Sequence, residues 1–271
     1  LYIALVALGI GAGVGLVTVG FIKAINLAQS AFFGKDELLL AQHLAAHVAW
    51  WHILLVPVLG GLAVGLLTQF FMPNQRPQGI ADVIEANALR SGSMSGVVGI
   101  KAIVLSTLSL GSGASVGREG PMVHLGAAMG SVAARQLGLA RHHARMLLSC
   151  GVAAAVAASF NAPLAGVFFA LEVVVGHYGF SAFAPVILSA VSATSVCRYF
   201  LGDETTFTVP SHTLAHVLEG PAFILLGLAG GAFALLISYG TRLSRQGFAR
   251  SPIPVWARPA LAGLVLGIVA I

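Results

Sequence analysis

Apolar segments long enough to cross a membrane recur along the whole chain, separated by short stretches rich in glycine, proline and charge. A helix of roughly 20 apolar residues spans the ~30 Å hydrocarbon core of a bilayer. The alternating ~10-residue segments typical of a transmembrane β-barrel do not occur in this pattern. The sequence therefore predicts an all-α polytopic membrane protein. Apolar spans are expected at 1–27, 52–71, 146–175, 180–200 and 221–240, with a further one beginning at 260.

Two apolar segments, 80–89 and 100–110, are too short to cross a bilayer as helices. The first follows a turn-rich break at 72–79 that contains two prolines, and it carries Asp82 and Glu85 in its opening turns, the end of a helix that favours acids. Short helices that start from such a break are typical of discontinuous or re-entrant elements, which persist only where they are buried or line a cavity.

Composition rules out an ordinary soluble domain, because 58% of the residues are hydrophobic, only 8% are charged and the mean hydropathy is +0.93. The net charge of +5 is spread over the loops, which fits the positive-inside rule better than nucleic-acid binding. The segment 241–258 contains four arginines, so the positive-inside rule assigns it to the cytoplasm. The segment 201–220 contains no Lys or Arg and is assigned to the outside. We expect a multi-pass protein of the cell (inner) membrane. Because both ends fall inside apolar runs, we also expect a piece of a larger protein.

The histidines and cysteines do not predict a metal site. Cys150 and Cys197 lie inside apolar runs and are expected to be small core residues. The pair His43 and His47 has i,i+4 spacing but no obvious third ligand, so an interfacial helix face is favoured. The basic connection at 139–145, with its two adjacent histidines, is expected to be a solvated loop.

The segment Gly117-Arg-Glu-Gly-Pro121 carries the main candidate chemistry. Pro121 fits the first turn of a helix, where its missing N–H costs nothing, and an uninterrupted apolar helix is predicted over 122–137. The free N–H groups of that helix would point at Arg118 and Glu119 and carry roughly half a positive charge, which favours an anion. An ionisable residue there is a candidate functional group. The structural alternative is a capped helix in which Glu119 pairs with Arg118.

Together with residues 111–116 before it and residues 123–126 after it, this segment resembles a motif of the CLC family of chloride channels and proton-coupled chloride transporters. A second block, Phe160-Asn-Ala-Pro-Leu-Ala-Gly166 with Glu172 six residues later, follows in family order and at family-like spacing. The resemblance runs over the whole chain and covers roughly family helices B to K. The Gly-x-Phe-x-Pro loop and the distal tyrosine that complete the family's anion site do not occur in this sequence.

The resemblance implies a single transmembrane domain over 1–271, with broken and re-entrant helices arranged as inverted repeats. The first repeat would cover about 1–200, and an incomplete second repeat would begin at about 220–271. Family members are homodimers in the bilayer with a separate, voltage-gated or exchange-type pore in each subunit. Chloride is the substrate, protons are possible co-substrates, and no cofactor or nucleic acid is expected.

The family's roles transfer to a small set of residues. Glu119 corresponds to the external gating glutamate, whose carboxylate competes with the anion for the same helix N-termini. Arg118 and Gly120 would contribute backbone N–H groups. The resemblance places the anion-binding residues at Gln78, Gly79, Arg118, Glu119 and Gly120.

Two departures from the family pattern bear on function. The first anion motif, Gly-Ser-Gly-Ile-Pro in the family, is Pro77-Gln-Gly-Ile-Ala81 here, so that Gln78 stands where a serine or proline helps to select the anion. An amide can still donate to an anion. The internal proton-relay position is Val173, which cannot carry a proton, and Glu172 is an alternative relay. The sequence favours a channel-like or weakly proton-coupled pathway over a chloride/proton antiporter.

Two other classes of function are less consistent with the sequence, which we do not expect to encode an enzyme. An intramembrane hydrolase would use Ser112 or Ser115 with His124, but the rhomboid-type Gly-x-Ser-Gly pattern does not occur, and His124 reads as a helix-packing residue. Nucleotide binding by the loop at 111–117 would need a Gly-Lys-Ser/Thr ending and a preceding strand.

Overall fold

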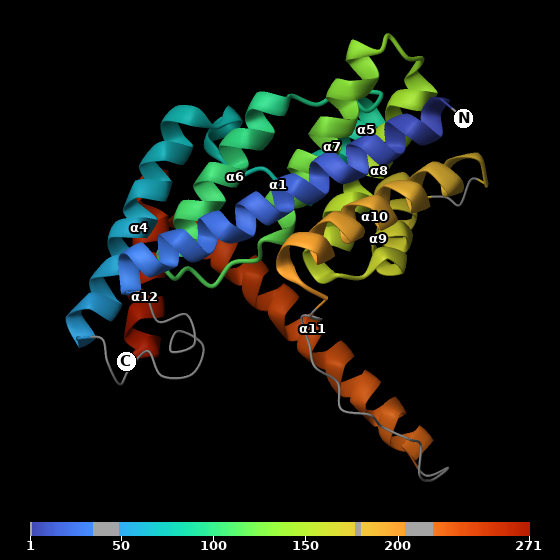
Figure 1. Cartoon of the computed structure of the whole chain (residues 1–271). Helices are drawn as coiled ribbons and strands as arrows, with labels where there is room; N and C mark the ends of the chain where they lie inside the picture. The colour runs from blue at the N-terminus through green and yellow to red at the C-terminus, as the bar shows by residue number, and fades with distance from the viewer. Residues whose placement is uncertain (1, 35–48, 177–179, 204–218) are drawn as a thin grey trace.

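The computed structural model describes residues 2–34, 49–176, 180–203 and 219–271, and all of its regular elements are helical (Figure 1). Five helices are long and apolar enough to cross a membrane, over Tyr2–Phe33, Trp50–Phe71, Arg141–Phe160, Phe183–Leu201 and Gly220–Arg250. The elements are α1 (Tyr2–Phe33), α4 (Trp50–Phe71), η1 (Pro73–Gln75), α5 (Ile80–Leu89), α6 (Gly96–Gly111), α7 (Glu119–Gln136), α8 (Arg141–Phe160), α9 (Pro163–Phe169), η2 (Ala170–Val175), α10 (Phe180–Leu201), α11 (Glu219–Arg250), η3 (Val255–Ala257) and α12 (Arg258–Ala270).

Helix α8 forms the centre of the core, because every residue from 147 to 159 is buried. It packs against α7, α10, α1 and α9. The stretch is rich in alanine and glycine, which lets the neighbouring backbones come close. At the α7–α8 contact a Cβ on Gly151 would collide with the backbone carbonyl of Gly126, so both positions require glycine at this packing distance. Cys150 and Cys197 are buried free thiols, as expected for small core residues.

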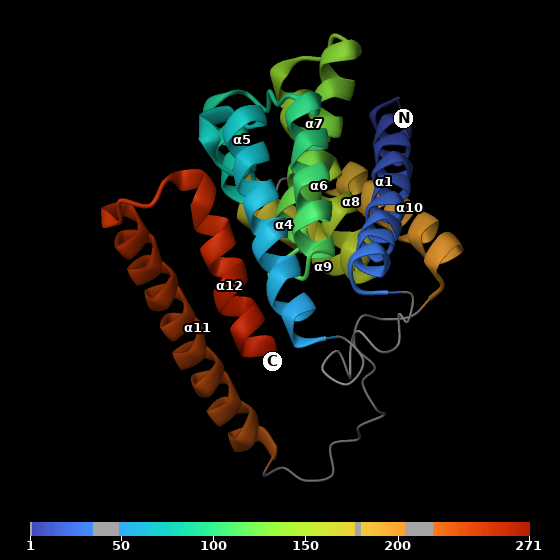
Figure 2. The same cartoon turned by 90° about the vertical axis from the view of Figure 1, so that its left-hand side faces the viewer.

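Helices α4 and α12 make a second close contact at the edge of the bundle (Figure 2). Added Cβ atoms on Gly61 and Gly65 would meet the backbone of Pro259 and Trp256, and one on Gly263 would meet the backbone of Pro57. Gly61 and Gly65, four residues apart on α4, therefore allow close helix packing.

The broken helices predicted from proline and glycine are present. Helix α5 covers Ile80–Leu89 and follows a break in which Asn74 and Gln75 have positive φ angles. The run at 146–175 is interrupted at Asn161, which ends α8 in the left-handed region with φ of 53°. Pro163 then starts α9, and a single π-helical turn, η2, follows without a gap.

Three boundaries differ from the prediction. Helix α6 begins at Gly96, so part of the expected polar loop is helical. Helix α8 begins at Arg141, so His142 and His143 lie in its first turn and not in a loop. Helix α11 continues to Arg250, because no proline occurs between Pro221 in its first turn and Pro252 beyond its end. The pair His43 and His47 lies outside the described residues.

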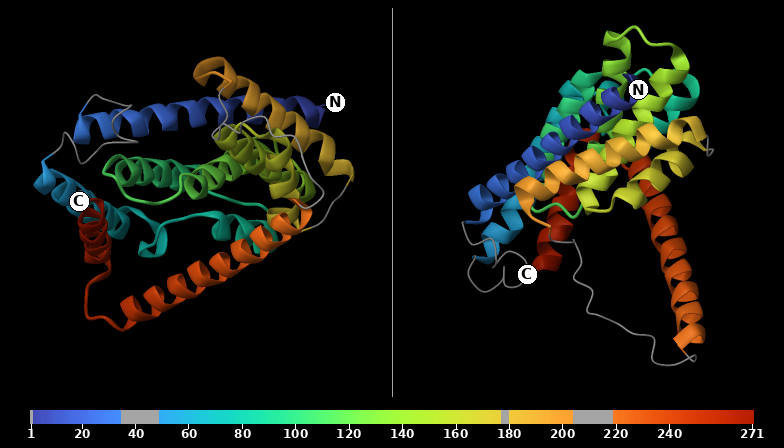
Figure 3. Two further views of the ribbon diagram at one scale, coloured as in Figure 1. Left: turned by 90° about the horizontal axis from the view of Figure 1, so that it is seen from below. Right: turned by 45° about the vertical axis from the view of Figure 1, so that its right-hand side comes forward.

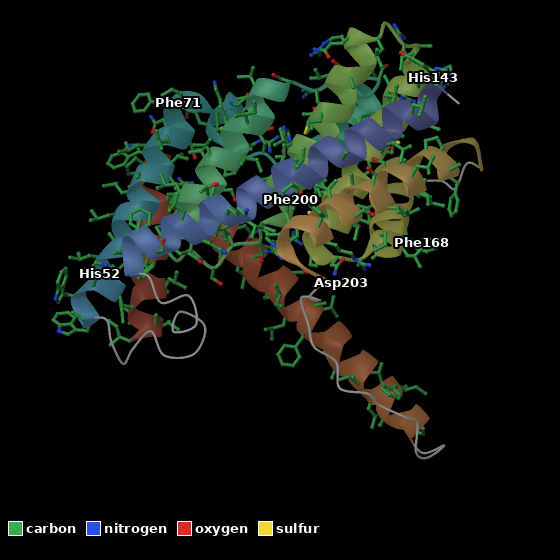
Figure 4. The ribbon with its side chains drawn as sticks, in the orientation of Figure 1. His52, Phe71, His143, Phe168, Phe200 and Asp203 are labelled. Carbon is green, nitrogen blue, oxygen red and sulfur yellow. The ribbon has the colours of Figure 1, made fainter. Side chains whose placement is uncertain are left out.

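Helix α11 stands apart from the other helices in all views (Figures 1, 2 and 3), and no residue in its most apolar stretch is buried. Its C-terminal end and the start of α12 lie on the same side of the molecule as α5 (Figure 2). Phe71 at the end of α4 and His143 near the start of α8 also lie toward that side, whereas His52 and Asp203 lie toward the opposite side (Figure 4).

Candidate functional site

The N-terminus of α5 is organised by a carboxylate from its own first turn. The backbone N–H of Gly79 donates to Asp82 Oδ2 at 2.8 Å, and Arg76 Nη2 pairs with Asp82 Oδ1 at 2.6 Å. The Asp82 side chain is only 12% exposed. An anionic group thus already interacts with the positive end of this helix, as expected for an acid in a first helical turn.

Gln78 lies directly before this terminus and points back toward the break. Its Nε2 donates to the carbonyl oxygens of Arg76 at 3.3 Å and of Pro73 at 3.5 Å. Both contacts are long, so they hold the amide weakly.

The second motif begins α7, as predicted from Pro121. Glu119 is the first helical residue, and Met122 N–H makes the first helical hydrogen bond, to Arg118 O at 3.4 Å. The Arg118 guanidinium donates to the carbonyl of Ser159 at 3.0 Å, which ties this loop to the end of α8. The Glu119 side chain folds back over Gly117, where an added Cβ would touch its carboxylate oxygen. Among the ion pairs of the described residues there is none between Arg118 and Glu119, so the structural alternative of such a pair is not observed.

The two motifs meet at their glycines. A Cβ built on Gly120 would lie 3.9 Å from the Gly79 Cα, so the two helix N-termini approach one another. In the first turn of a helix the N–H groups have no acceptor within the helix. The structure therefore brings Gly79 and Gly120 together with Arg118 and Glu119 on the adjacent turn.

Two cavities adjoin this meeting point, and Gln78 lines both. One, of about 510 Å³, is polar and is walled by η1, α5, the start of α6 and α7. The other, of about 210 Å³, is largely apolar and reaches Val116, Gly117 and Pro121. Gln78 therefore lies between a polar cavity and an apolar one that ends beside the Glu119 motif.

The candidate relay position lies in a different environment. Glu172 is exposed on η2, which packs against α5, α8 and α9. Its neighbour Val173 is 40% exposed and lines a third cavity, of about 910 Å³, together with Arg141 and Arg145 from α8. The structure does not place Glu172 in the lining of either cavity beside Gln78.

A polar cluster not anticipated from the sequence closes the other end of α8. Arg198 donates to Asn161 Oδ1 at 2.7 Å and pairs with Asp203 at 2.9 Å. The Asn161 Nδ2 also donates to Asp203 Oδ1 at 3.4 Å. Their pairing joins residues 42 apart and follows from the packing of α10 on α8 and α9.

The structure does not bring Ser112 and His124 together as the serine–histidine pair of a hydrolase. Ser112 is 1% exposed and its Oγ donates to the Ser109 carbonyl of its own helix. His124 instead lines the polar cavity. A serine nucleophile needs a base within hydrogen-bond reach, and the described residues around Ser112 offer none.

Comparisons with known proteins identify the family of this chain. A sequence profile described as voltage gated chloride channel matches residues 60–271. The chain therefore belongs to the CLC family of voltage-gated chloride channels, whose members are transporters. It is 35% identical over 269 residues to a Ralstonia nicotianae protein named as ClcB-like, covering 97% of this chain and 62% of that protein. It is 31% identical over 271 residues to the voltage-gated ClC-type chloride channel ClcB of Citrobacter koseri, covering 98% and 64%.

Solved structures show the same fold. A slow cyanobacterial Cl⁻/H⁺ antiporter matches with a TM-score of 0.83 at 22% identity, over 99% of this chain and 63% of that one. A CLC-type fluoride/proton antiporter matches with a TM-score of 0.76 at 28% identity, over 99% and 65%. The chain spans less than two thirds of the length of these relatives.

Proposed function

We propose that this chain forms the first part of a chloride-type anion pathway in which Glu119 is the gate and Gln78, Gly79, Arg118 and Gly120 surround the anion. The observation that carries the proposal is the position of Gln78. It lines both the polar cavity and the apolar cavity that ends at Gly117, and its neighbour Gly79 approaches Gly120. An anion moving from one cavity to the other would pass both helix N-termini.

The gate works by competition for one positive field. The Glu119 carboxylate lies in the first turn of α7, where negative charge is favoured, and a chloride ion would be favoured at the same place. Two negative charges at one site repel each other, so protonation of Glu119 or movement of its side chain admits the anion. The Arg118 contact with Ser159 fixes the loop while the Glu119 side chain moves.

Val173 favours a channel-like or weakly proton-coupled pathway, because no titratable group stands at the position of the internal relay. The alternative is chloride/proton antiport, which is the activity named for the cyanobacterial relative in the structural comparison. We propose a homodimer in the cell membrane with chloride as the substrate and no cofactor.

Chloride efflux from liposomes, with simultaneous recording of external pH, tests both parts of the proposal. The full-length protein is compared with its Glu119→Gln variant. Chloride efflux with no accompanying proton movement, and altered gating in the variant, is the expected result. Asp203→Asn is the matched control, because it also replaces a carboxylate by an amide, and Asp203 is exposed, pairs with Arg198 and lines neither cavity beside Gln78.

Chloride-driven proton movement that is lost in Glu119→Gln would establish an antiporter and overturn the inference from Val173. Absence of halide flux from both proteins would remove the chloride assignment.

A further inference from the structure

A buried histidine lies beside the proposed anion site, and the proposed gating mechanism does not use it. His124 is 3% exposed, and its Nδ1 is a buried atom without a hydrogen-bond partner. Buried polar atoms normally have partners, so an orphaned ring nitrogen requires an explanation. This nitrogen belongs to a residue that lines the polar cavity of about 510 Å³.

The position of His124 on α7 follows from helical spacing. It lies four residues after Gly120, so the two share one face of α7 and are one turn, ~6 Å, apart. That face approaches Gly79, and both the Gly79 backbone and the Asp82 carboxylate lie close enough to interact electrostatically with the ring. The imidazole is therefore next to the α5 N-terminus, on the cavity side.

The charged groups that line the cavity carry an excess of positive charge. Asp82 is paired with Arg76, and Glu85 is paired with Arg90. Arg135, from the same helix as His124, also lines the cavity, and its guanidinium donates to the Met94 carbonyl at 3.5 Å. Helix α6 contributes only Val98, and α1 and α8 contribute no residue to this lining. With both acids paired, a proton on His124 would add to the excess positive charge of Arg135.

We propose that His124 is a proton-binding site at the cytoplasmic mouth of the anion pathway, and that its protonation strengthens anion binding at Gly79 and Gly120. The assignment deepens the proposed function and rests on it. Histidine is the side chain that ordinarily gains or loses its charge between about pH 5 and pH 8. Because burial disfavours the charged ring, the proton is taken up together with the anion that offsets its charge. Linkage makes the effect reciprocal: a bound anion favours the protonated ring to the same extent that the protonated ring favours the anion.

The side of the membrane follows from the distribution of charge. The cavity opens next to η1 and the first residues of α6, at the end of the molecule where α4 and α7 terminate. The C-terminal end of the arginine-rich α11 lies on that same side (Figure 2). The positive-inside rule assigns this side to the cytoplasm.

The test is chloride affinity of the full-length protein, measured by calorimetry at pH 5.5 and pH 8.0 in four proteins. These are the wild type, Glu119→Gln, His124→Gln and the double variant. Glu119→Gln removes the titration of the gate, so any remaining pH dependence comes from another group. Glutamine at 124 keeps a polar side chain of similar length but cannot take up a proton in this range.

We expect chloride binding in Glu119→Gln to be roughly tenfold tighter at pH 5.5 than at pH 8.0, and we expect the double variant to lose this difference. His143→Gln, near the start of α8 and outside the lining of the polar cavity, should retain it. A His124 that served only for packing would change affinity equally at both pH values, since no charge would be involved.

An equal pH dependence in Glu119→Gln and in the double variant would overturn the proposal and leave the Glu119 gate intact. The same measurement on His124→Gln with Glu119 unchanged gives an independent comparison with the wild type, and an unaltered pH dependence there would also overturn it. Absence of chloride binding in every protein would contradict the proposed function and, with it, the role of His124.

Discussion

At the scale of single residues, the site depends on a few side chains that face two helix N-termini. Asp82 occupies the first turn of α5, Glu119 occupies the first turn of α7, and Gln78 lies between the two cavities. Each carboxylate is placed where a helix favours negative charge. Asp82 is tied to Arg76 and to the Gly79 N–H, whereas the Glu119 carboxylate folds over a glycine. Asp82 is therefore held in place by its contacts, whereas the Glu119 side chain is suited to move.

We predict that Gln78→Ser increases chloride flux and changes the ratio of nitrate to chloride permeation by about fivefold, which corresponds to ~1 kcal/mol. The shorter side chain loses the long contacts to Pro73 and Arg76 and widens the connection between the two cavities. Anion-exchange flux in liposomes measures the ratio. Gln136→Ser, at the exposed end of α7, should leave it unchanged, and an unchanged ratio in Gln78→Ser would exclude Gln78 from the pathway.

At the scale of elements, the close approach of neighbouring helices depends on glycines at the few points where their backbones cross. The α7–α8 contact requires Gly126 and Gly151, and the α4–α12 contact requires Gly61, Gly65 and Gly263. The α7–α8 contact holds α7 against the core and thereby fixes the direction in which its N-terminus points. The site thus depends on residues that touch no substrate.

We predict that Gly151→Ala lowers the thermal stability of the protein in detergent, because its Cβ would meet the backbone carbonyl of Gly126 and force the helices apart. Overpacking of this kind typically costs about 1–3 kcal/mol. Gly20→Ala on α1 is the matched control, since nothing lies within 4 Å of its added Cβ. A melting temperature equal for both variants would contradict the account of this crossing.

The elements were largely predictable from the sequence, and the reasons differ between them. Pro121 lies in the first turn of α7 and Pro163 begins α9, as the chemistry of proline favours. The Pro/Gly break before Ile80 predicted α5 with its observed ends. The start of α8 was missed because the arginines and histidines of 141–145 were interpreted as a solvated loop, although the segment contains no proline or glycine that would end a helix.

The candidate site was only partly predictable, because a sequence shows spacing along one helix but not which helices meet. The Glu119 motif was recognisable from its glycines and proline. His124 was interpreted as a packing residue, although its i,i+4 spacing from Gly120 indicated a shared face. Its significance depends on the approach of α5, which no local pattern encodes.

At the scale of the whole molecule, basic side chains gather at one end of the bundle. Arg76, Arg90 and Arg135 line the polar cavity, and Arg141 and Arg145 line the cavity beside Val173. The ion pair of Arg198 with Asp203 lies at the opposite end (Figure 4). From this asymmetry and the positive-inside rule we expect the polar cavity to face the cytoplasm.

We predict that a cysteine introduced as Asn74→Cys reacts with a membrane-impermeant maleimide only from the cytoplasmic side, whereas Trp50→Cys reacts only from outside. The two positions flank the same helix, α4, and both are exposed. The native thiols Cys150 and Cys197 are buried, so background labelling should be low. Labelling of Asn74→Cys from outside intact cells would contradict the orientation that we infer.

The competition between the Glu119 carboxylate and the anion is the central claim, and chloride calorimetry at a fixed pH of about 7.5 tests it most directly. Glu119→Gln keeps the size of the side chain and removes its charge, so the variant should bind chloride about tenfold more tightly than the wild type, a gain of ~1.4 kcal/mol. Asp203→Asn, which also replaces a carboxylate by an amide but lies outside both cavities beside Gln78, should bind like the wild type. Equal chloride affinity in Glu119→Gln and the wild type would contradict the account, because the carboxylate and the anion would then not share one site.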